Sequence, residues 1–122
     1  MRDTTEEAWR DAEAKVAKMS EAQQARRSDG LQRKAVGQDR LLALAEHGEV
    51  LDSCLYTTPG KFGGGGAGTT WLVGSSADVA DALLRYQALG ITHFILSDTP
   101  YKQEVVRIGE QLLSRLNERA VA

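Results

Sequence analysis

Residues 91–97 (Ile-Thr-His-Phe-Ile-Leu-Ser) form a nearly continuous apolar run, which constrains the fold more than any other feature of the chain. The run predicts a β-strand that is buried on both faces, as strands of parallel sheets are. Leaving its large apolar side chains in water would forfeit about 1.5–3 kcal/mol each, and together they rival the about 5–15 kcal/mol net stability of a domain. Because a strand also needs hydrogen-bonded neighbours, we expect further strands beside it.

The rest of the chain supplies almost no neighbouring strand. Helical spacing of apolar residues predicts helices over residues 5–19, 31–47 and 75–89, and a last helix from Thr99 to about Glu118. Residues 70–73 are a short extended candidate that could cover one edge at most. The order helix, strand, helix is typical of an α/β protein with parallel strands. We therefore expect other chains, either copies of this one or a different polypeptide, to supply the missing strands.

Local signals place the ends of these helices. Thr4-x-x-Glu7 and Ser75-x-x-Asp78 have the spacing of capping boxes. Thr99 is predicted as an N-cap, with Pro100 at the first helical position. The polar residues 20–27 could form either a short helix or a solvated turn. The last helix is predicted to bury an apolar stripe made of Val105, Ile108, Leu112 and Leu116.

Composition and charge exclude several classes of protein. The 122 residues carry a formal net charge of −2 with no pole of either sign, which argues against binding nucleic acid or an anionic membrane. No run is apolar enough to span a membrane, and the acidic N-terminal residues do not resemble a signal peptide. The single Cys54 cannot form an internal disulfide, and one Cys with two His lacks the ligands of a zinc site. We therefore expect no metal and a reducing, cytoplasmic setting.

Residues 48–70 show no sustained periodicity and contain a glycine-rich segment. Irregular stretches of this length inside a compact domain are usually functional or disordered. Gly63-x-Gly65-x-x-Gly68 formally matches a dinucleotide-binding fingerprint, but no predicted strand precedes it and no helix follows it directly. Lys61 precedes the glycines, so the segment is not a phosphate-binding Walker loop. Either a functional loop or a flexible linker with a solvated Lys61 fits this composition.

Five blocks of the chain occur together, in the same order, in one known family. They are residues 2–9 (RDTTEEAW), 35–40 (AVGQDR), 65–69 (GGAGT), 72–74 (LVG) and 89–97 (LGITHFILS). With this order and spacing the chain resembles the C-terminal portion of the bacterial luciferase-like flavin-dependent monooxygenases, closest to the alkanesulfonate monooxygenase branch. The similarity spans nearly all 122 residues and does not indicate the substrate.

The resemblance implies that the chain is the C-terminal part of a (β/α)8 barrel, an α/β fold. Residues 1–47 would be helices, residues 48–70 a Gly-rich insertion loop, and residues 71–122 the crossover helix, last strand and last helix. A complete barrel needs about 250 residues, so residues 1–122 would form a partial barrel domain that is mostly helical as an isolated chain. A start at a strand-to-helix junction is what a split gene, a truncated reading frame or an excised fragment would give.

The resemblance also implies a cofactor and partners. Members of the family take reduced FMN from a separate flavin reductase and use O2 to oxygenate a small organic substrate. Most of the family's flavin-phosphate contacts, and its catalytic Cys and His, lie upstream of the region that this chain resembles. No catalytic residue is therefore assigned, and Cys54 is expected to be passive. Activity would require an N-terminal barrel polypeptide or a related subunit.

Two groups of residues are candidates for the site. The family's lid over reduced flavin corresponds to the glycine-rich segment, and the family's anion-binding Arg is replaced here by a glycine. Barrels of this type also place active-site groups at the C-terminal ends of strands, where the alkanesulfonate branch has a Tyr in place of Thr99. The cofactor-binding or lid candidates are Lys61, Gly63, Gly64, Gly65, Gly66 and Gly68, and the strand-end candidates are Ser97, Asp98, Thr99 and Tyr101.

Simpler roles compete with these. Asp98 and Thr99 could serve only as caps of the last helix. His93 lies in the middle of the predicted strand and is expected to be a packed residue rather than a base. His93, Ser97 and Asp98 cannot form a catalytic triad on one strand, because neighbouring side chains alternate between its faces.

The leading interpretation is a C-terminal subunit or fragment of an FMNH2-dependent monooxygenase that is inactive alone. The alternative is a non-catalytic interaction protein, a barrel remnant that associates with a related enzyme or with itself. An independent small-ligand binding module is disfavoured, because the chain encodes too little enclosing structure.

Overall fold

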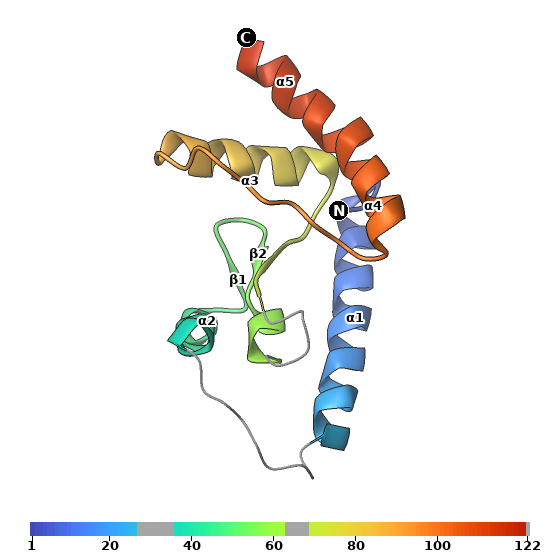
Figure 1. Ribbon diagram of the computed structural model, residues 1–122, viewed down its shortest axis with the longest axis vertical. Coiled ribbons are helices and arrows are strands. Elements are labelled where there is room, and N and C mark those ends of the chain that lie inside the picture. The colour runs from blue at the N-terminus through green and yellow to red at the C-terminus, as the bar shows by residue number, and fades with distance from the viewer. Residues whose placement is uncertain (27–35, 63–68, 122) are drawn as a thin grey trace.

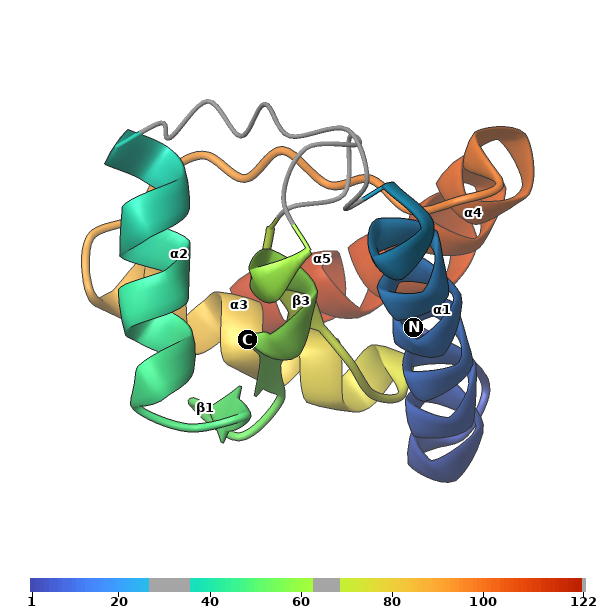
Figure 2. The same ribbon diagram turned by 90° about the horizontal axis from the view of Figure 1, so that it is seen from below.

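Helices dominate the computed structural model, which describes residues 1–26, 36–62 and 69–121 (Figure 1). A small sheet lies below helix α3, and α1 runs along one side of the molecule. Two views at right angles show α2 on the side of the sheet opposite to α1 (Figure 2). The elements are α1 (Thr5–Arg26), α2 (Val36–Glu46), β1 (Val50–Leu51), β2 (Leu55–Tyr56), β3 (Trp71–Leu72), α3 (Ser76–Ala88), α4 (Tyr101–Arg107) and α5 (Ser114–Val121).

The first helix begins where its capping signal predicts and ends later than its apolar spacing predicts. The backbone N–H of Glu7 donates to Thr4 Oγ1 at 3.2 Å, which satisfies one of the free donors of the first turn. The polar stretch that could have been a turn is helical as far as Arg26. Its Glu, Ala and Gln residues are good helix formers, so the helix continues without an apolar stripe. For the second helix, only residues 36–46 of the predicted range are described as helix, and residues 31–35 lie outside the described residues.

The third helix confirms its predicted capping box. The N–H of Asp78 donates to Ser75 Oγ at 3.3 Å, and the N–H of Ser75 donates to Asp78 Oδ2 at 2.9 Å. Gly74 precedes the box because a Cβ there would lie 2.8 Å from the Cβ of Asp78. Gly90 follows the helix with φ +99°, a conformation that favours glycine.

The sequence predicted residues 48–70 to be a loop, but part of this range forms regular structure. β1 and β2 form an antiparallel hairpin, and β2 pairs antiparallel with β3. A turn in which Asp52 and Ser53 both have positive φ closes the hairpin. The buried Thr57 fixes its base by donating its hydroxyl to the carbonyl of Gly48 at 2.6 Å. A 3-10 helix, Thr58–Lys61, follows. Strands of two residues are too short to show an alternating pattern, so periodicity could not reveal β1 and β2. β3 confirms the short extended segment that was predicted at residues 70–73.

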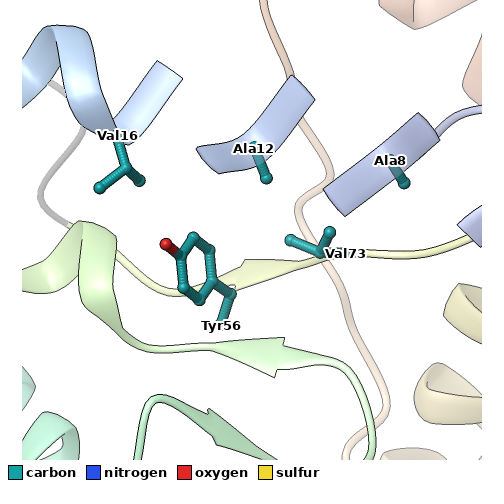
Figure 3. Close-up of a cluster of buried hydrophobic side chains, with 5 residues drawn as sticks. All are labelled: Ala8, Ala12, Val16, Tyr56 and Val73. Atoms are coloured by element: carbon teal, nitrogen blue, oxygen red, sulfur yellow. The ribbon is translucent and has the colours of Figure 1, made fainter. Parts of the chain in front are cut away.

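Two hydrophobic clusters hold these elements together. In the first, α1 places Ala8, Ala12 and Val16 against Tyr56 and Val73 of the sheet region (Figure 3). The small alanines let the helix approach closely, and Trp9 contacts Tyr56 edge to face with 5.1 Å between ring centroids. In the second, α3 packs against the C-terminal helices through Val79, Ala80, Leu83 and Leu112, with Leu96 at its margin.

The predicted strand over residues 91–97 is not a strand in this chain. The segment crosses the molecule in an extended path from the end of α3 to the start of α4, without regular secondary structure (Figure 1). Among the described residues, no backbone hydrogen bond pairs residues 92–98 with another segment. A strand is defined by its partners, so an apolar run without neighbours stays extended and unpaired.

The last helix differs from its prediction at its start and on its buried face. Pro100 has extended dihedrals and occupies the N-cap position, so the helix begins at Tyr101 and Thr99 is not its cap. From there α4, a π-helical stretch (Ile108–Leu113) and α5 follow without a break. The predicted stripe is wrong at Val105, which is exposed, because the inward position is taken by Glu104.

The chain is therefore mostly helical as expected, but its sheet is antiparallel and does not close into a barrel. Arg2 and Ser75 form a parallel bridge beside that sheet. In the part of the chain that the structure describes, no helix is long and apolar enough to cross a membrane.

Candidate functional site

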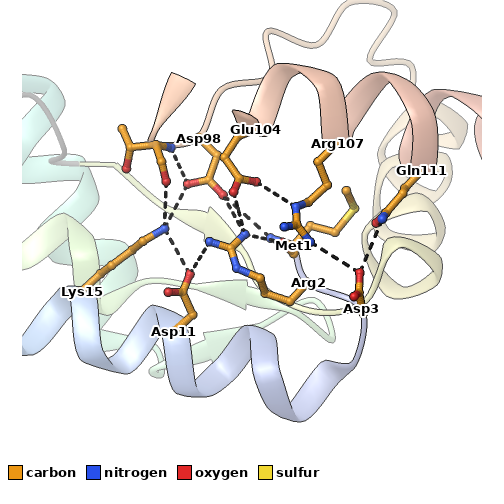
Figure 4. Close-up of polar contacts among 10 residues, drawn as sticks. Met1, Arg2, Asp3, Asp11, Lys15, Asp98, Glu104, Arg107 and Gln111 are labelled. Atoms are coloured by element: carbon orange, nitrogen blue, oxygen red, sulfur yellow. Dashed lines mark hydrogen bonds and ion pairs between the residues drawn. The ribbon is translucent and has the colours of Figure 1, made fainter. Parts of the chain in front are cut away.

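Three junctions between an extended segment and a helix meet at one place in the molecule. Arg2 precedes α1, Gly74 and Ser75 precede α3, and Asp98 precedes α4. The N–H of Arg2 donates to the carbonyl of Gly74 at 3.3 Å, and Arg2 Nη1 lies 3.8 Å from Asp98 Oδ2 (Figure 4). The three extended segments are far apart in the sequence, but their C-terminal ends and the helices that follow them meet at one site.

The centre of this site is a buried carboxylate. Glu104 is only 3% exposed. Its Oε1 lies 3.1 Å from Arg2 Nη1, and its Oε2 lies 3.5 Å from Arg107 Nε. A buried charge is tolerated only when it is paired and hydrogen-bonded. The guanidinium groups of Arg107 in α4 and of Arg2 in the segment before α1 supply that pairing. Glu104 thus ties the last helix to the N-terminal junction.

Asp98 is held by cations rather than used as a helix cap. Its Oδ1 lies 3.4 Å from Lys15 Nζ and accepts the backbone N–H of Thr99 at 2.7 Å. Lys15 also donates to the carbonyl of Thr99 at 3.2 Å and pairs with Asp11 at 3.1 Å, and Arg2 Nη2 lies 2.7 Å from the same Asp11 carboxylate. These contacts fasten the end of the extended segment to α1 (Figure 4).

A cavity of about 850 Å³ opens beside this polar network. Its length follows the extended segment, from Ile91 near the end of α3 to Asp98 at the network. Its walls come from α1, β3, α3 and the extended segment, and they are largely apolar. The residues that form them include Ala12, Trp71, Val79, Leu83, Phe94 and Leu96.

The structure brings one of the two predicted groups together. Ser97, Asp98, Thr99 and Tyr101 line the same end of the cavity, and Asp98 alone among them joins the ion-pair network. Lys61 is exposed at the end of the 3-10 helix, and it is not among the described residues that line this cavity. The predicted Gly63, Gly64, Gly65, Gly66 and Gly68 lie outside the described residues.

A second, smaller cavity of about 200 Å³ lies between α1 and the hairpin. Cys54 is buried in its wall, and this burial raises the pKa of the thiol, which disfavours the reactive thiolate. Asp78 lies in the same wall, and hydrogen bonds from the Thr5 and Ser75 hydroxyls hold the pKa of its carboxyl below the ordinary value. The shifted pKa values of Cys54 and Asp78 are therefore explained by burial and by hydrogen bonds within the fold.

His93 is exposed, contrary to the packed position that the sequence predicted. Its Nδ1 lies 2.8 Å from Thr92 Oγ1, on the same unpaired segment. A packed histidine needs neighbouring strands to pack against, and the described residues provide none on that side. The prediction that His93 is packed depended on strands lying beside residues 91–97.

The charged groups at the site are engaged with one another, and these contacts hold the chain in place. Arg2, Lys15 and Arg107 each contact carboxylates. A flavin phosphate bound to these three cations would have to displace those carboxylates. Lys18, which is exposed in the cavity wall, would offer a phosphate only a single point charge, so the described residues do not by themselves form the phosphate site of FMN. Within the described ranges, no group of three His, Cys, Asp or Glu residues could hold a metal ion.

No protein-family model matches the chain, and no solved structure matches it.

Sequence reasoning missed the residues at the centre of the network, namely Arg2, Lys15 and Glu104. The spacing of Asp11 and Lys15, four residues apart on a helix, was a detectable signal of a local ion pair. Glu104 gave a weaker signal, because it stands i−4 from Ile108 and i−8 from Leu112 on the buried face of the last helix. Its pairing with Arg107 at i+3 was a second local signal, whereas its partner Arg2 lies about a hundred residues away in sequence, which no local pattern reveals.

Proposed function

We propose that this chain is the C-terminal subunit or fragment of an FMNH2-dependent monooxygenase, which uses O2 to oxygenate a small organic substrate once an N-terminal barrel partner is bound. The observation that supports this most is the meeting of the three junctions before α1, α3 and α4. In a β/α barrel every strand-to-helix junction lies on one face, which is the face that carries the active site. The parallel bridge between Arg2 and Ser75 also supports the proposal, because neighbouring strands of such a barrel are parallel.

The unpaired segment over residues 91–97 supports the need for a partner. Its exposed apolar side chains and unpaired backbone groups are what a barrel strand would present in the absence of its neighbours. The partner polypeptide would supply these neighbours and the flavin-phosphate contacts that the described residues lack. Ser97 and Asp98 would then lie at the strand end that faces the substrate.

Co-expression with the N-terminal portion of a luciferase-like barrel tests this proposal. We expect a stable complex that binds FMNH2 under anaerobic conditions, measured by calorimetry, and that couples FMNH2 oxidation to oxygenation of a panel of small sulfonates and aldehydes. A complex that forms but does not bind FMNH2 contradicts the flavin assignment. Failure of every such barrel portion to bind contradicts the assembly.

Lys61 is the cation proposed to contact the substrate or flavin anion in the assembled enzyme. Lys61→Ala should lower turnover by up to about 100-fold, because a charge-assisted contact in a dry site is worth roughly 2–3 kcal/mol. Lys102→Ala is the matched control, since it removes another exposed lysine, on α4. If Lys61→Ala and Lys102→Ala have equal turnover rates, Lys61 has no role in the site.

The alternative, a non-catalytic interaction protein, is favoured by the exposure of the same apolar segment. It predicts association without FMNH2 binding in any assembly.

A further inference from the structure

The extended segment over residues 91–97 presents unpaired backbone groups and exposed apolar side chains at the surface. Ile95 is 100% exposed, and Ile91 and Phe94 also belong to the exposed apolar residues. Among the described residues, no backbone hydrogen bond pairs residues 92–97 with another segment. An unpaired row of N–H and C=O groups is a template for another strand.

The segment is held in place rather than free. At its start, the N–H of Ile91 donates to the carbonyl of Tyr86 at 3.2 Å. At its end, Lys15 holds Asp98 and the carbonyl of Thr99. Between them, Leu96 packs against the cluster formed by α3 and the C-terminal helices. The backbone edge is therefore presented by fixed ends, which reduces the entropy lost on pairing.

The segment also lacks the features that normally prevent edge pairing. Exposed edges are usually protected by charged side chains, especially Lys, or by Pro. Residues 89–97 (LGITHFILS) contain no Lys, Arg, Asp, Glu or Pro. Two copies of this segment can therefore meet without placing like charges opposite each other.

We infer that residues 91–97 form the interface of a symmetric dimer, in which the segments of two copies pair as antiparallel strands. A two-fold axis relates identical surfaces, so the same apolar side chains lie opposite each other across the pair. A small apolar molecule in the 850 Å³ cavity would cover side chains such as Phe94 but would leave the backbone groups unpaired. A second copy satisfies both.

This inference does not depend on the monooxygenase proposal, because it concerns the chain alone. A monomeric chain would overturn the dimer and leave the flavin proposal intact. A dimer of the chain, together with barrel-portion complexes that bind no FMNH2, would leave the dimer intact and overturn the flavin proposal. In an assembled enzyme, the strands of the partner would replace the second copy.

Sedimentation equilibrium of the full chain tests the dimer. We expect a species of twice the chain mass at micromolar concentration, and a monomer for Ile95→Lys, which places two ammonium groups in the interface. The Ile95 side chain is fully exposed, so the substitution should leave the monomer fold and its circular dichroism unchanged. The matched control is Val105→Lys, which adds the same charge at an exposed apolar position on α4 and should stay dimeric.

Spin labels give a second readout. A nitroxide on Ile95→Cys should show an intermolecular distance within about 20 Å, because paired strands lie about 4.8 Å apart and rise about 3.3 Å per residue. Native Cys54 is buried, so labelling at the exposed cysteine is selective. A label on Leu113→Cys should give a longer distance.

A wild-type chain that stays monomeric overturns the inference. So does a dimer that survives Ile95→Lys, or a dimer whose Ile95 labels lie no closer than the Leu113 labels. Aggregation that Ile95→Lys does not reduce also overturns it, since another surface would then be responsible.

Discussion

Glu104 shows how a single residue can fix the position of an element. It is buried between Arg2 and Arg107, so both of its oxygens are paired. Glu104→Gln should lower the free energy of unfolding by about 2–3 kcal/mol. Breaking a fully buried pair costs about 3–5 kcal/mol, and we expect a smaller loss here because the arginine partners of Glu104 are partly exposed. Urea denaturation followed by circular dichroism measures this difference.

The control for this prediction lies on the same helical stretch. Glu110→Gln makes the same chemical change at an exposed position, where an effect within about 0.5 kcal/mol is expected. If the free energy of unfolding falls by the same amount in both variants, the ion pairs of Glu104 make no specific contribution to stability. A loss below about 1 kcal/mol for Glu104→Gln would likewise contradict the argument from burial.

Residues whose partners are close in sequence could be predicted, and residues whose partners are distant could not. Ser75 and Asp78 satisfy each other across three positions, so their pattern predicted both the contact and the start of the helix. Asp98 was singled out as a site candidate at the end of the apolar run, which stays a prediction, and its role as a cap was wrong. Its main contact, Lys15, comes from α1 through the tertiary fold.

At the scale of the element, the N-terminus of α3 should be sensitive to acid. Hydrogen bonds from Thr5 and Ser75 hold the pKa of Asp78 below its ordinary value of 3.8 in the folded chain. A carboxyl with a lowered folded pKa adds stability that is fully present above the unfolded pKa and is lost as the pH falls through the folded value. Stability should therefore decline below about pH 4 partly because Asp78 becomes protonated.

Asp78→Asn isolates this contribution. We expect the variant to be less stable than the wild type at pH 7, with the difference shrinking at pH 3, as measured by urea unfolding at both values. Asp81→Asn is the comparison, because Asp81 is an exposed residue of the same helix and pairs with Arg119 at the surface. A difference between wild type and Asp78→Asn that is equal at both pH values would show that the carboxylate charge is not the cause.

The extended segment carries the clearest lesson about elements. Its apolar pattern predicted a strand buried on both faces, and the segment is instead mostly exposed and has no regular secondary structure. The prediction was wrong because strand formation depends on neighbours that the described residues do not supply. The hairpin of β1 and β2 was missed for the opposite reason, since two-residue strands leave no periodic signal and their pairing depends on the turn at Asp52 and Ser53.

At the scale of the whole molecule, the two hydrophobic clusters leave the face of residues 91–97 uncovered. One cluster joins α1 to the sheet, and the other joins α3 to the C-terminal helices. The extended segment crosses between them and is covered on its inner side at Leu96. The proposed dimer and the proposed barrel partner would therefore compete for the same surface. Adding an N-terminal barrel portion should convert the dimer into a one-to-one complex.

The isolated chain should bind FMN poorly. Lys15 lines one end of the 850 Å³ cavity, and carboxylates engage it, as they engage the neighbouring Arg2 and Arg107, so binding a phosphate to these cations would require breaking existing ion pairs. Titration with FMN, followed by flavin fluorescence and calorimetry, should give no saturation at micromolar concentration, and riboflavin should behave nearly alike, because the single exposed ammonium group of Lys18 in the cavity wall makes only a weak phosphate contact. In the complex with a barrel portion, FMN should bind more tightly than riboflavin. Stoichiometric FMN binding by the chain alone, with a preference over riboflavin, would show that its own residues form the phosphate site and that the partner supplies only the missing strands.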